Sequence, residues 1–163
     1  MPQETGLNIG LKESYVGKEK PGKATRRIFP INVYHFENYT PGKTIIYHDE
    51  YISGSQLGAG QEIVEINNER FTRTYLGGVS APSTLKRLSI TPGEIYSFLK
   101  ETIVEKIEET RLKENCYLQK DNWQYYYKII ANDIDPPTTC AKETIKYKDK
   151  IVFVHWVTLC QIK

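Results

Sequence analysis

The sequence has 163 residues, 39% of them hydrophobic, and its 22 Lys and Arg against 20 Asp and Glu give a formal net charge of +2 at pH 7. A chain of this length buries enough surface to fold without metal or disulfide staples, which excludes a peptide-like scaffold and a largely disordered tail. The nearly balanced charge argues against a duplex nucleic-acid binder, which would carry a stronger basic excess. We therefore expect one domain over residues 1–163.

The sequence carries no sign of export or of membrane insertion. It has no run of about 18 uncharged apolar residues, and its N-terminal part lacks the apolar centre of a signal peptide. Its cysteines are odd in number and widely spaced, which predicts free thiols rather than a zinc site or a disulfide framework: Cys116, Cys140 and Cys160. We expect a cytoplasmic protein with no cofactor, no metal and no membrane partner.

The N-terminal segment, residues 1–27, is polar, basic and rich in glycine. Leu7, Ile9 and Leu11 alternate with other residues, which is compatible with a short edge strand. The basic stretch 18–27 is typical of a loop.

A first β unit is expected over residues 28–78. Two strands rich in β-branched and aromatic residues, 28–36 and 44–52, precede a hairpin over 62–76. Its turn is Asn67-Asn68, because asparagine tolerates the positive φ that a type I′ turn requires.

One long helix is expected over residues 91–112. Thr91 is placed to cap it, Pro92 suits the first helical position, and Glu94 completes a capping box. Apolar residues at helical spacing continue to Leu112, so the helix would lay one stripe on a sheet. The flanking segments expected to be loops are 79–90 and 113–122.

A second β unit is expected over residues 123–162. It begins with a tyrosine-rich strand and ends in a hairpin whose turn is Lys148-Asp149. The stretch Ile151–Val157 is almost uninterruptedly apolar, which predicts a central strand that is covered on both faces.

The two hairpins coincide when the sequence is shifted by 81 residues (143 − 62), which places Glu62 on Glu143 and Tyr75 on Trp156. The predicted fold class is therefore α+β: a mostly antiparallel, twisted sheet from two repeated β units packed on one long helix. The alternative is that any two hairpins look alike.

Several short segments resemble an uncharacterised bacterial family, the domain-of-unknown-function family numbered 5680. The segments that carry the resemblance are Tyr15-Val16-Gly17, Arg26-Arg27, 47–54 (YHDEYISG), 60–64 (GQEIV) and 75–78 (YLGG). Phe71 stands where the family has tryptophan, and Arg73 replaces its methionine. Because the family has no established activity, the resemblance implies a fold and boundaries, over about residues 12–162, and no chemistry.

Glu62 and Glu143 invite an acid–base interpretation, since a pseudo-symmetric cleft would bring two carboxylates together. The other interpretation is structural, with each glutamate fixing the loop before its hairpin. No nucleophile motif is present. A hydrolase that uses the paired glutamates is therefore the weaker alternative, and an enzyme is less expected than a binding protein.

The strand residues Phe71, Arg73 and Tyr75 alternate, so they share one face of the sheet. An arginine between two aromatic rings can stack and bind phosphate, and as an exposed residue Arg73 would contribute little to stability. The structural alternative is that the Arg73 side chain lies over the rim of the core with its charge in solvent. Together with other aromatic and basic side chains they predict a Tyr/Arg-rich ligand-binding cleft. The further candidates for this cleft are Arg26, Arg27, Tyr47, Tyr51, Glu62, Tyr127 and Trp156.

The histidines offer little support for a metal site. His35 and His48 lie near Asp49 and Glu50 on adjacent predicted strands, but their separation matches no usual ligand spacing. His155 lies within an apolar run, which predicts a hydrogen-bonded core histidine.

The functional hypothesis is a non-enzymatic cytoplasmic binding protein that sequesters or senses a small anionic ligand, such as a nucleotide-derived signal. The alternative is a protein-interaction or inhibitor module of phage or bacterial origin that uses exposed tyrosines as anchors. Homo-oligomerisation stays open.

Overall fold

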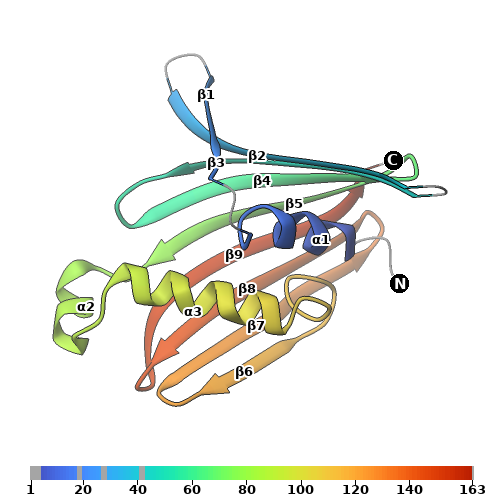
Figure 1. Cartoon of the computed structure of the whole chain (residues 1–163). Coiled ribbons are helices and arrows are strands. Elements are labelled where there is room, and N and C mark those ends of the chain that lie inside the picture. The colour runs from blue at the N-terminus through green and yellow to red at the C-terminus, as the bar shows by residue number, and fades with distance from the viewer. Residues whose placement is uncertain (1–4, 18–19, 27–28, 41–42, 163) are drawn as a thin grey trace.

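One nine-stranded antiparallel sheet forms the body of the molecule, in the strand order β1-β2-β3-β4-β5-β9-β8-β7-β6 (Figure 1). The structure is a computed structural model that describes residues 5–17, 20–26, 29–40 and 43–162. The strands are β1 (Gly22–Arg26), β2 (Phe29–Thr40), β3 (Lys43–Ser53), β4 (Leu57–Ile66), β5 (Glu69–Val79), β6 (Cys116–Lys120), β7 (Trp123–Ile134), β8 (Pro137–Tyr147) and β9 (Lys150–Ile162). Within these described ranges the helices are α1 (Thr5–Glu13), α2 (Pro82–Leu88) and α3 (Pro92–Glu105).

The predicted fold class is wrong. The described chain is mostly β, its sheet is continuous across β5 and β9, and its helices are short, so no long helix packs on two repeated β units. The predicted helix begins at Pro92 but ends at Glu105. Beyond it, Arg111 adopts a positive φ of 58° and directs its side chain to Glu143, so burial of that ion pair overrides the helical spacing of the apolar residues.

The N-terminal segment also differs from the prediction, because Leu7 and Leu11 lie on a helix rather than on an edge strand. They are four residues apart, and both are buried against the sheet. Gly10 allows the close approach of α1, since a Cβ there would lie 2.1 Å from the ring of Tyr47. The segments predicted as loops likewise contain β1, α2 and β6, each too short for hydrophobic periodicity to identify.

The local signals at the ends of elements are confirmed. Thr91 accepts a hydrogen bond from the Glu94 backbone N–H, and the Glu94 carboxylate accepts one from the Thr91 backbone N–H. The hairpin turns Asn67-Asn68 and Lys148-Asp149 have positive φ at all four residues. These are short-range interactions, which is why sequence alone identifies them.

Two hydrophobic clusters hold the helices against the same face of the curved sheet (Figure 1). Ile95, Leu99 and Ile103 of α3 pack with residues of β7, β8 and β9, while Leu7 of α1 packs with residues of β2 to β5. β9 is central as predicted, but it is covered on one face only, because Trp156 is 51% exposed. The inner face therefore holds the core and the outer face meets solvent.

Candidate functional site

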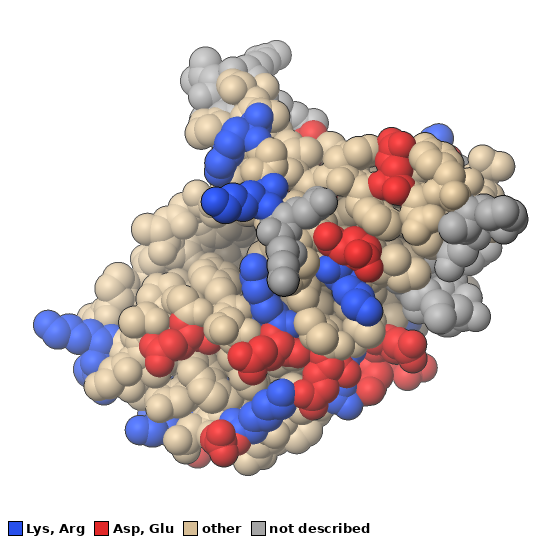
Figure 2. Space-filling view, in the orientation of Figure 1, with Lys and Arg blue, Asp and Glu red and all other residues tan. Residues whose placement is uncertain are grey.

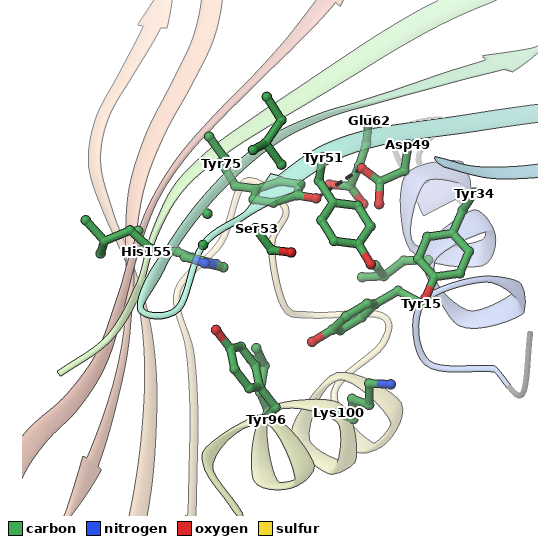
Figure 3. Close-up of a pocket in the computed structure, with 18 of the residues that line it drawn as sticks. Tyr15, Tyr34, Asp49, Tyr51, Ser53, Glu62, Tyr75, Tyr96, Lys100 and His155 are labelled. Atoms are coloured by element: carbon green, nitrogen blue, oxygen red, sulfur yellow. Dashed lines mark hydrogen bonds between the residues drawn. The ribbon is translucent and has the colours of Figure 1, made fainter. Parts of the chain in front are cut away.

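A cavity of about 440 Å³ lies where α3 faces the ends of β3, β4 and β5. Figure 2 shows the surface hollowed between α3 and the strands that curl over it, and Figure 3 shows the side chains that surround the space. A volume of this size suits a small organic molecule. The polar and aromatic residues of its lining include Tyr15, Tyr34, Asp49, Tyr51, Ser53, Glu62, Tyr75, Tyr96, Lys100, Arg111 and His155.

The sheet wall of the cavity is shaped by a glycine between two tyrosines. Tyr51, Gly60 and Tyr75 are register partners on β3, β4 and β5. A Cβ at Gly60 would lie 2.3 Å from the Tyr75 hydroxyl and 2.8 Å from the Tyr51 Cβ, so the Tyr75 ring lies across the strand where the glycine leaves room. The arrangement positions the Tyr75 hydroxyl 3.1 Å from Asp49 Oδ1, to which it donates.

Tyrosine side chains from several elements meet in this space. The Tyr34 and Tyr51 rings stack with centroids 6.0 Å apart, and Tyr15 and Tyr96 enter from the helical side (Figure 3). Burial raises the phenolic pKa of Tyr15 and that of Tyr51. The hydroxyls are therefore neutral near pH 7, and each can donate as well as accept.

A row of register partners, Asp49 on β3, Glu62 on β4 and Arg73 on β5, carries buried charge beside the cavity. The Arg73 guanidinium binds Glu62 in a bidentate pair, and Tyr47 donates to Glu62 Oε1 at 2.8 Å. Burial alone would raise the pKa of Glu62, but the charge of Arg73 outweighs it and holds this pKa below the usual range. Arg73 donates its remaining hydrogen bonds to Asn8 and to the Arg111 carbonyl.

Asp49 differs from Glu62 in having no cationic partner of its own. Its side chain is 2% exposed, and its one hydrogen bond from the described residues comes from Tyr75 to Oδ1. Burial first, and the neighbouring Glu62 carboxylate second, raise the pKa of Asp49 to about 8. The cavity thus contains a carboxyl group whose second oxygen is free to bind a ligand.

A second buried ion pair joins the segment after α3 to β8. Arg111 donates to both oxygens of Glu143, at 2.8 and 2.7 Å, and Tyr125 donates to Oε1 at 2.7 Å. Burial opposes ionisation of Glu143, yet Arg111 holds its pKa well below the usual range. His155 is buried with Nδ1 3.2 Å from Glu143, so the prediction of a hydrogen-bonded core histidine is confirmed, although the ring also lines the cavity.

Lys100 on α3 is, beside Arg111, a second cation of the described cavity wall. Its ammonium lies 4.6 Å from the centroid of the Tyr15 ring, a cation–π contact. Among the described residues it has no carboxylate partner. An anionic group of a ligand could therefore bind it without displacing an ion pair from the described part of the chain.

The structure brings some predicted site residues together and separates others. Tyr51, Glu62 and Tyr75 line the cavity. Phe71, Tyr47 and Tyr127 are buried in the core, and Trp156 points from the outer face, as expected for the neighbour of the inward His155. Arg26 ends β1, and Arg27 lies outside the described residues.

The expectation that Arg73 is exposed and contributes little to stability is wrong. Arg73 is 0% exposed, and its donors bind Glu62, Asn8 and the Arg111 carbonyl. Phe71, Arg73 and Tyr75 do alternate along one strand, but this face is the inner one. The alternation along β5 shows that the three side chains share a face of the sheet, but it does not show whether that face is buried or exposed. The reason is that Glu62, which compensates the charge of Arg73, lies on the neighbouring strand β4.

Sequence reasoning missed most of the residues that complete the cavity. The omitted residues are Tyr15, Tyr34, Asp49, Tyr96, Lys100, Arg111 and His155. Asp49 had one available signal, a carboxylate at an inward position between the alternating Tyr47 and Tyr51. Tyr15, Lys100 and Arg111 reach the site from segments whose packing no local pattern reveals.

The remaining chemistry of the described chain is modest. His35 and His48 face each other across β2 and β3, and each ring contacts a glutamate. No group of three or more potential metal ligands occurs among the residues that the structure describes. All three cysteines are free, as predicted. No helix within the described ranges is both long and apolar enough to cross a membrane.

Comparison of the chain with family models, with curated proteins and with solved structures gives no match. The resemblance to the family numbered 5680 therefore stays a prediction.

Proposed function

We propose that the chain is a non-enzymatic, cytoplasmic binding protein that holds a small ligand with an anionic group in the tyrosine-lined cavity. The observation that carries the proposal is Lys100. Its ammonium faces a preformed cavity, lies over Tyr15, and lacks a carboxylate partner among the described residues. An anion at this point gains a charge-assisted contact and disturbs no ion pair among the residues that the structure describes.

The aromatic walls support the same proposal. Tyr15, Tyr51 and Tyr96 offer rings for apolar or planar parts of a ligand, and their neutral hydroxyls can donate to its oxygens. A nucleotide has both a planar ring and an anionic group, so it remains a fitting example of the class.

The test is a calorimetric titration of the full chain with mono-, di- and cyclic nucleotides. We expect Lys100→Met to weaken binding roughly ten- to a hundred-fold, which corresponds to the loss of a charge-assisted contact of about 1.5–3 kcal/mol. Lys142→Met is the matched control, because it removes an ammonium that lies over Trp156 on the outer face. Equal binding by Lys100→Met would count against the proposal, and failure of every nucleotide to bind would exclude nucleotides from the ligand class.

The enzymatic alternative now has a different candidate group. Glu62 and Glu143 are each held by an arginine, which leaves neither suited to proton transfer. Asp49, whose pKa burial raises to about 8, is the carboxyl of the cavity wall that could exchange a proton with a ligand. Heat release followed by mass analysis separates the cases, since a binding protein returns its ligand unchanged.

The protein-interaction alternative is favoured by an observation on the outer face. Leu76 and Trp156 are register partners there, 58% and 51% exposed. Retention of a partner protein by the wild-type chain and its loss in Trp156→Ala would support this alternative.

A further inference from the structure

The buried carboxyl groups near the cavity differ in whether a cation compensates their charge. Glu62 and Glu143 each form a bidentate pair with their own arginine. Asp49 is equally buried, but it has only the Tyr75 hydroxyl, and its Oδ2 accepts no hydrogen bond from the described residues. An ionised carboxylate in such a place is costly unless a cation compensates it.

The surroundings of Asp49 are suited to supply that compensation from a ligand. Tyr34 is its register partner on β2, and the Tyr34 ring stacks with Tyr51, whose side chain lies next to Asp49 on the cavity side (Figure 3). Aromatic rings attract cations through their quadrupole. An ammonium at this point would therefore meet a carboxylate and ring surfaces together.

We propose that the ligand also carries an amine, which binds the Asp49 carboxylate, so that the ligand is a zwitterion. This proposal rests on the proposed function, in which Lys100 binds the anionic group. Asp49 belongs to the sheet wall and Lys100 to the helix wall, so the two ends of the ligand bind different walls of the cavity.

The charge balance of the site agrees with such a ligand. With Asp49 ionised, the described charged groups at the site are three acids, Asp49, Glu62 and Glu143, and three bases, Arg73, Lys100 and Arg111. Their sum is zero. A zwitterion keeps this sum at zero when Asp49 ionises on binding, whereas a singly charged anion gives a sum of zero only while Asp49 keeps its proton.

The proposal also predicts that the protein releases a proton when the ligand binds. Asp49 is largely protonated near pH 7, because burial and the neighbouring Glu62 raise its pKa to about 8. Binding of an ammonium stabilises the ionised form, so the complex releases a proton, and affinity rises as pH increases from 6 to 8. The other titratable or charged groups that face Asp49 from the surrounding elements are Tyr34, Tyr75, Arg73 and Arg111.

The experiment compares ligands that share a skeleton and differ only in charge. 4-(Aminomethyl)benzoate, 4-methylbenzoate, benzylamine and benzyl alcohol form one series, and 6-aminohexanoate, hexanoate, pentylamine and pentanol form another, so that each zwitterion carries its two charges at opposite ends. Each is titrated by calorimetry into the full chain at pH 6 and pH 8, in buffers of different ionisation enthalpy that reveal proton release.

We expect the zwitterion of at least one series to bind at least tenfold more tightly than the acid on the same skeleton, with proton release. Asp49→Asn should abolish this advantage, and Glu50→Gln should keep it, since Glu50 is the next residue on the outward side of β3. Thermal unfolding of Asp49→Asn checks that the variant is folded.

The outcomes separate the two proposals. If acids or nucleotides bind through Lys100 but an added amine brings no advantage, or if the advantage survives in Asp49→Asn, the zwitterion proposal is wrong and the binding function stands. If no member of either series binds while nucleotides do, the zwitterion proposal is also rejected. If neither the series nor the nucleotides bind, both proposals fall.

Discussion

Glu62 and Glu143 are alike in their immediate contacts and different in what their arginines connect. Each glutamate accepts a bidentate arginine pair and a tyrosine hydroxyl, from Tyr47 in one case and Tyr125 in the other. Arg73 is the register partner of Glu62 on the adjacent strand, so this pair is internal to the sheet. Arg111 comes from the segment after α3, so the pair with Glu143 ties that segment to β8.

The difference shows how two similar ion pairs take different parts in the site. The Glu62 pair leaves Asp49, the next residue in the row, as the one carboxyl of the wall without a cation among the described residues. The Glu143 pair instead fixes Arg111 in the cavity wall, and Glu143 also contacts His155. The first pair thus uses Arg73 and leaves Asp49 without a cation of its own in the described part of the chain, and the second pair positions Arg111 in the wall near Asp49.

The largest expected effect is that of breaking the internal pair. Arg73→Ala leaves Glu62 buried without its cation and should lower the free energy of unfolding by about 3–5 kcal/mol. Arg70→Ala is the control, because its pair with Glu65 is exposed and should contribute no more than about 1 kcal/mol. Equal effects in denaturant titrations would show that the Glu62 pair does not stabilise the sheet.

Breaking the Arg111–Glu143 pair should lower the free energy of unfolding somewhat less. Arg111→Ala leaves Glu143 without its cation, but it also removes a side chain from the cavity wall, so water can reach the carboxylate. We therefore expect a decrease near the lower end of the same range, about 3 kcal/mol. Denaturant unfolding followed by tryptophan fluorescence measures it. A loss larger than that of Arg73→Ala would reverse the order assigned to the two pairs.

Asp49, the carboxyl without a cationic partner among the described residues, should make the free energy of unfolding depend on pH in the opposite direction to Glu62 and Glu143, which are paired with arginines. The folded Asp49 keeps its proton up to a pKa of about 8, whereas the unfolded side chain loses it near pH 4. Unfolding between these values releases a proton, so stability falls as pH rises through this window, by no more than about 1.4 kcal/mol per pH unit. Glu62 and Glu143, whose pKa values are lowered, lose their contribution only below about pH 4.5.

The Asp49 contribution is measured by comparing the pH slopes of variants. Asp49→Asn should flatten the slope of unfolding free energy between pH 5 and 8, and Asp133→Asn, at an exposed position of β7, is the control. An unchanged slope in Asp49→Asn would mean that this carboxyl is ionised in the folded protein.

The smallest expected effect is at the start of α3, upstream of Arg111. Thr91→Ala removes the hydroxyl that accepts from the Glu94 N–H and should cost about 0.5–2 kcal/mol. Ser97→Ala, at an exposed position within the same helix, is the control. If the cap supports the Arg111–Glu143 pair, Thr91→Ala should have a smaller effect in an Arg111→Ala background.

The sequence predicted the features that depend on neighbours in the chain. The Thr91 cap and the Asn67-Asn68 turn are determined by residues within one turn of backbone, so their signals are local. The predicted fold class is wrong because the alternation of Leu7, Ile9 and Leu11 suggests a strand where α1 lies, and the apolar spacing up to Leu112 suggests one helix where α3 ends at Glu105. In both cases tertiary burial, of Leu7 and Leu11 or of Arg111, outweighed the local pattern.

The site was predicted only in part for a similar reason. Glu62 and Tyr75 were recognised because their strand is unambiguous, yet the pairing of Arg73 with Glu62 depends on strand register. Lys100 and Tyr15 come into contact because α3 packs against the segment after α1. No residue spacing in the sequence predicts this packing. Convergence of distant segments, rather than any motif, forms this cavity.

Filling the cavity tests the central claim most directly. Ser53 is an exposed residue whose side chain faces the space, so Ser53→Trp should occupy it without disturbing the core (Figure 3). Leu76→Trp, on the outer face, adds the same ring elsewhere. In calorimetric titrations with the tightest ligand of the panels above, we predict that Ser53→Trp loses binding and that Leu76→Trp binds like the wild type. Undiminished binding by a folded Ser53→Trp would show that the cavity is not the binding site.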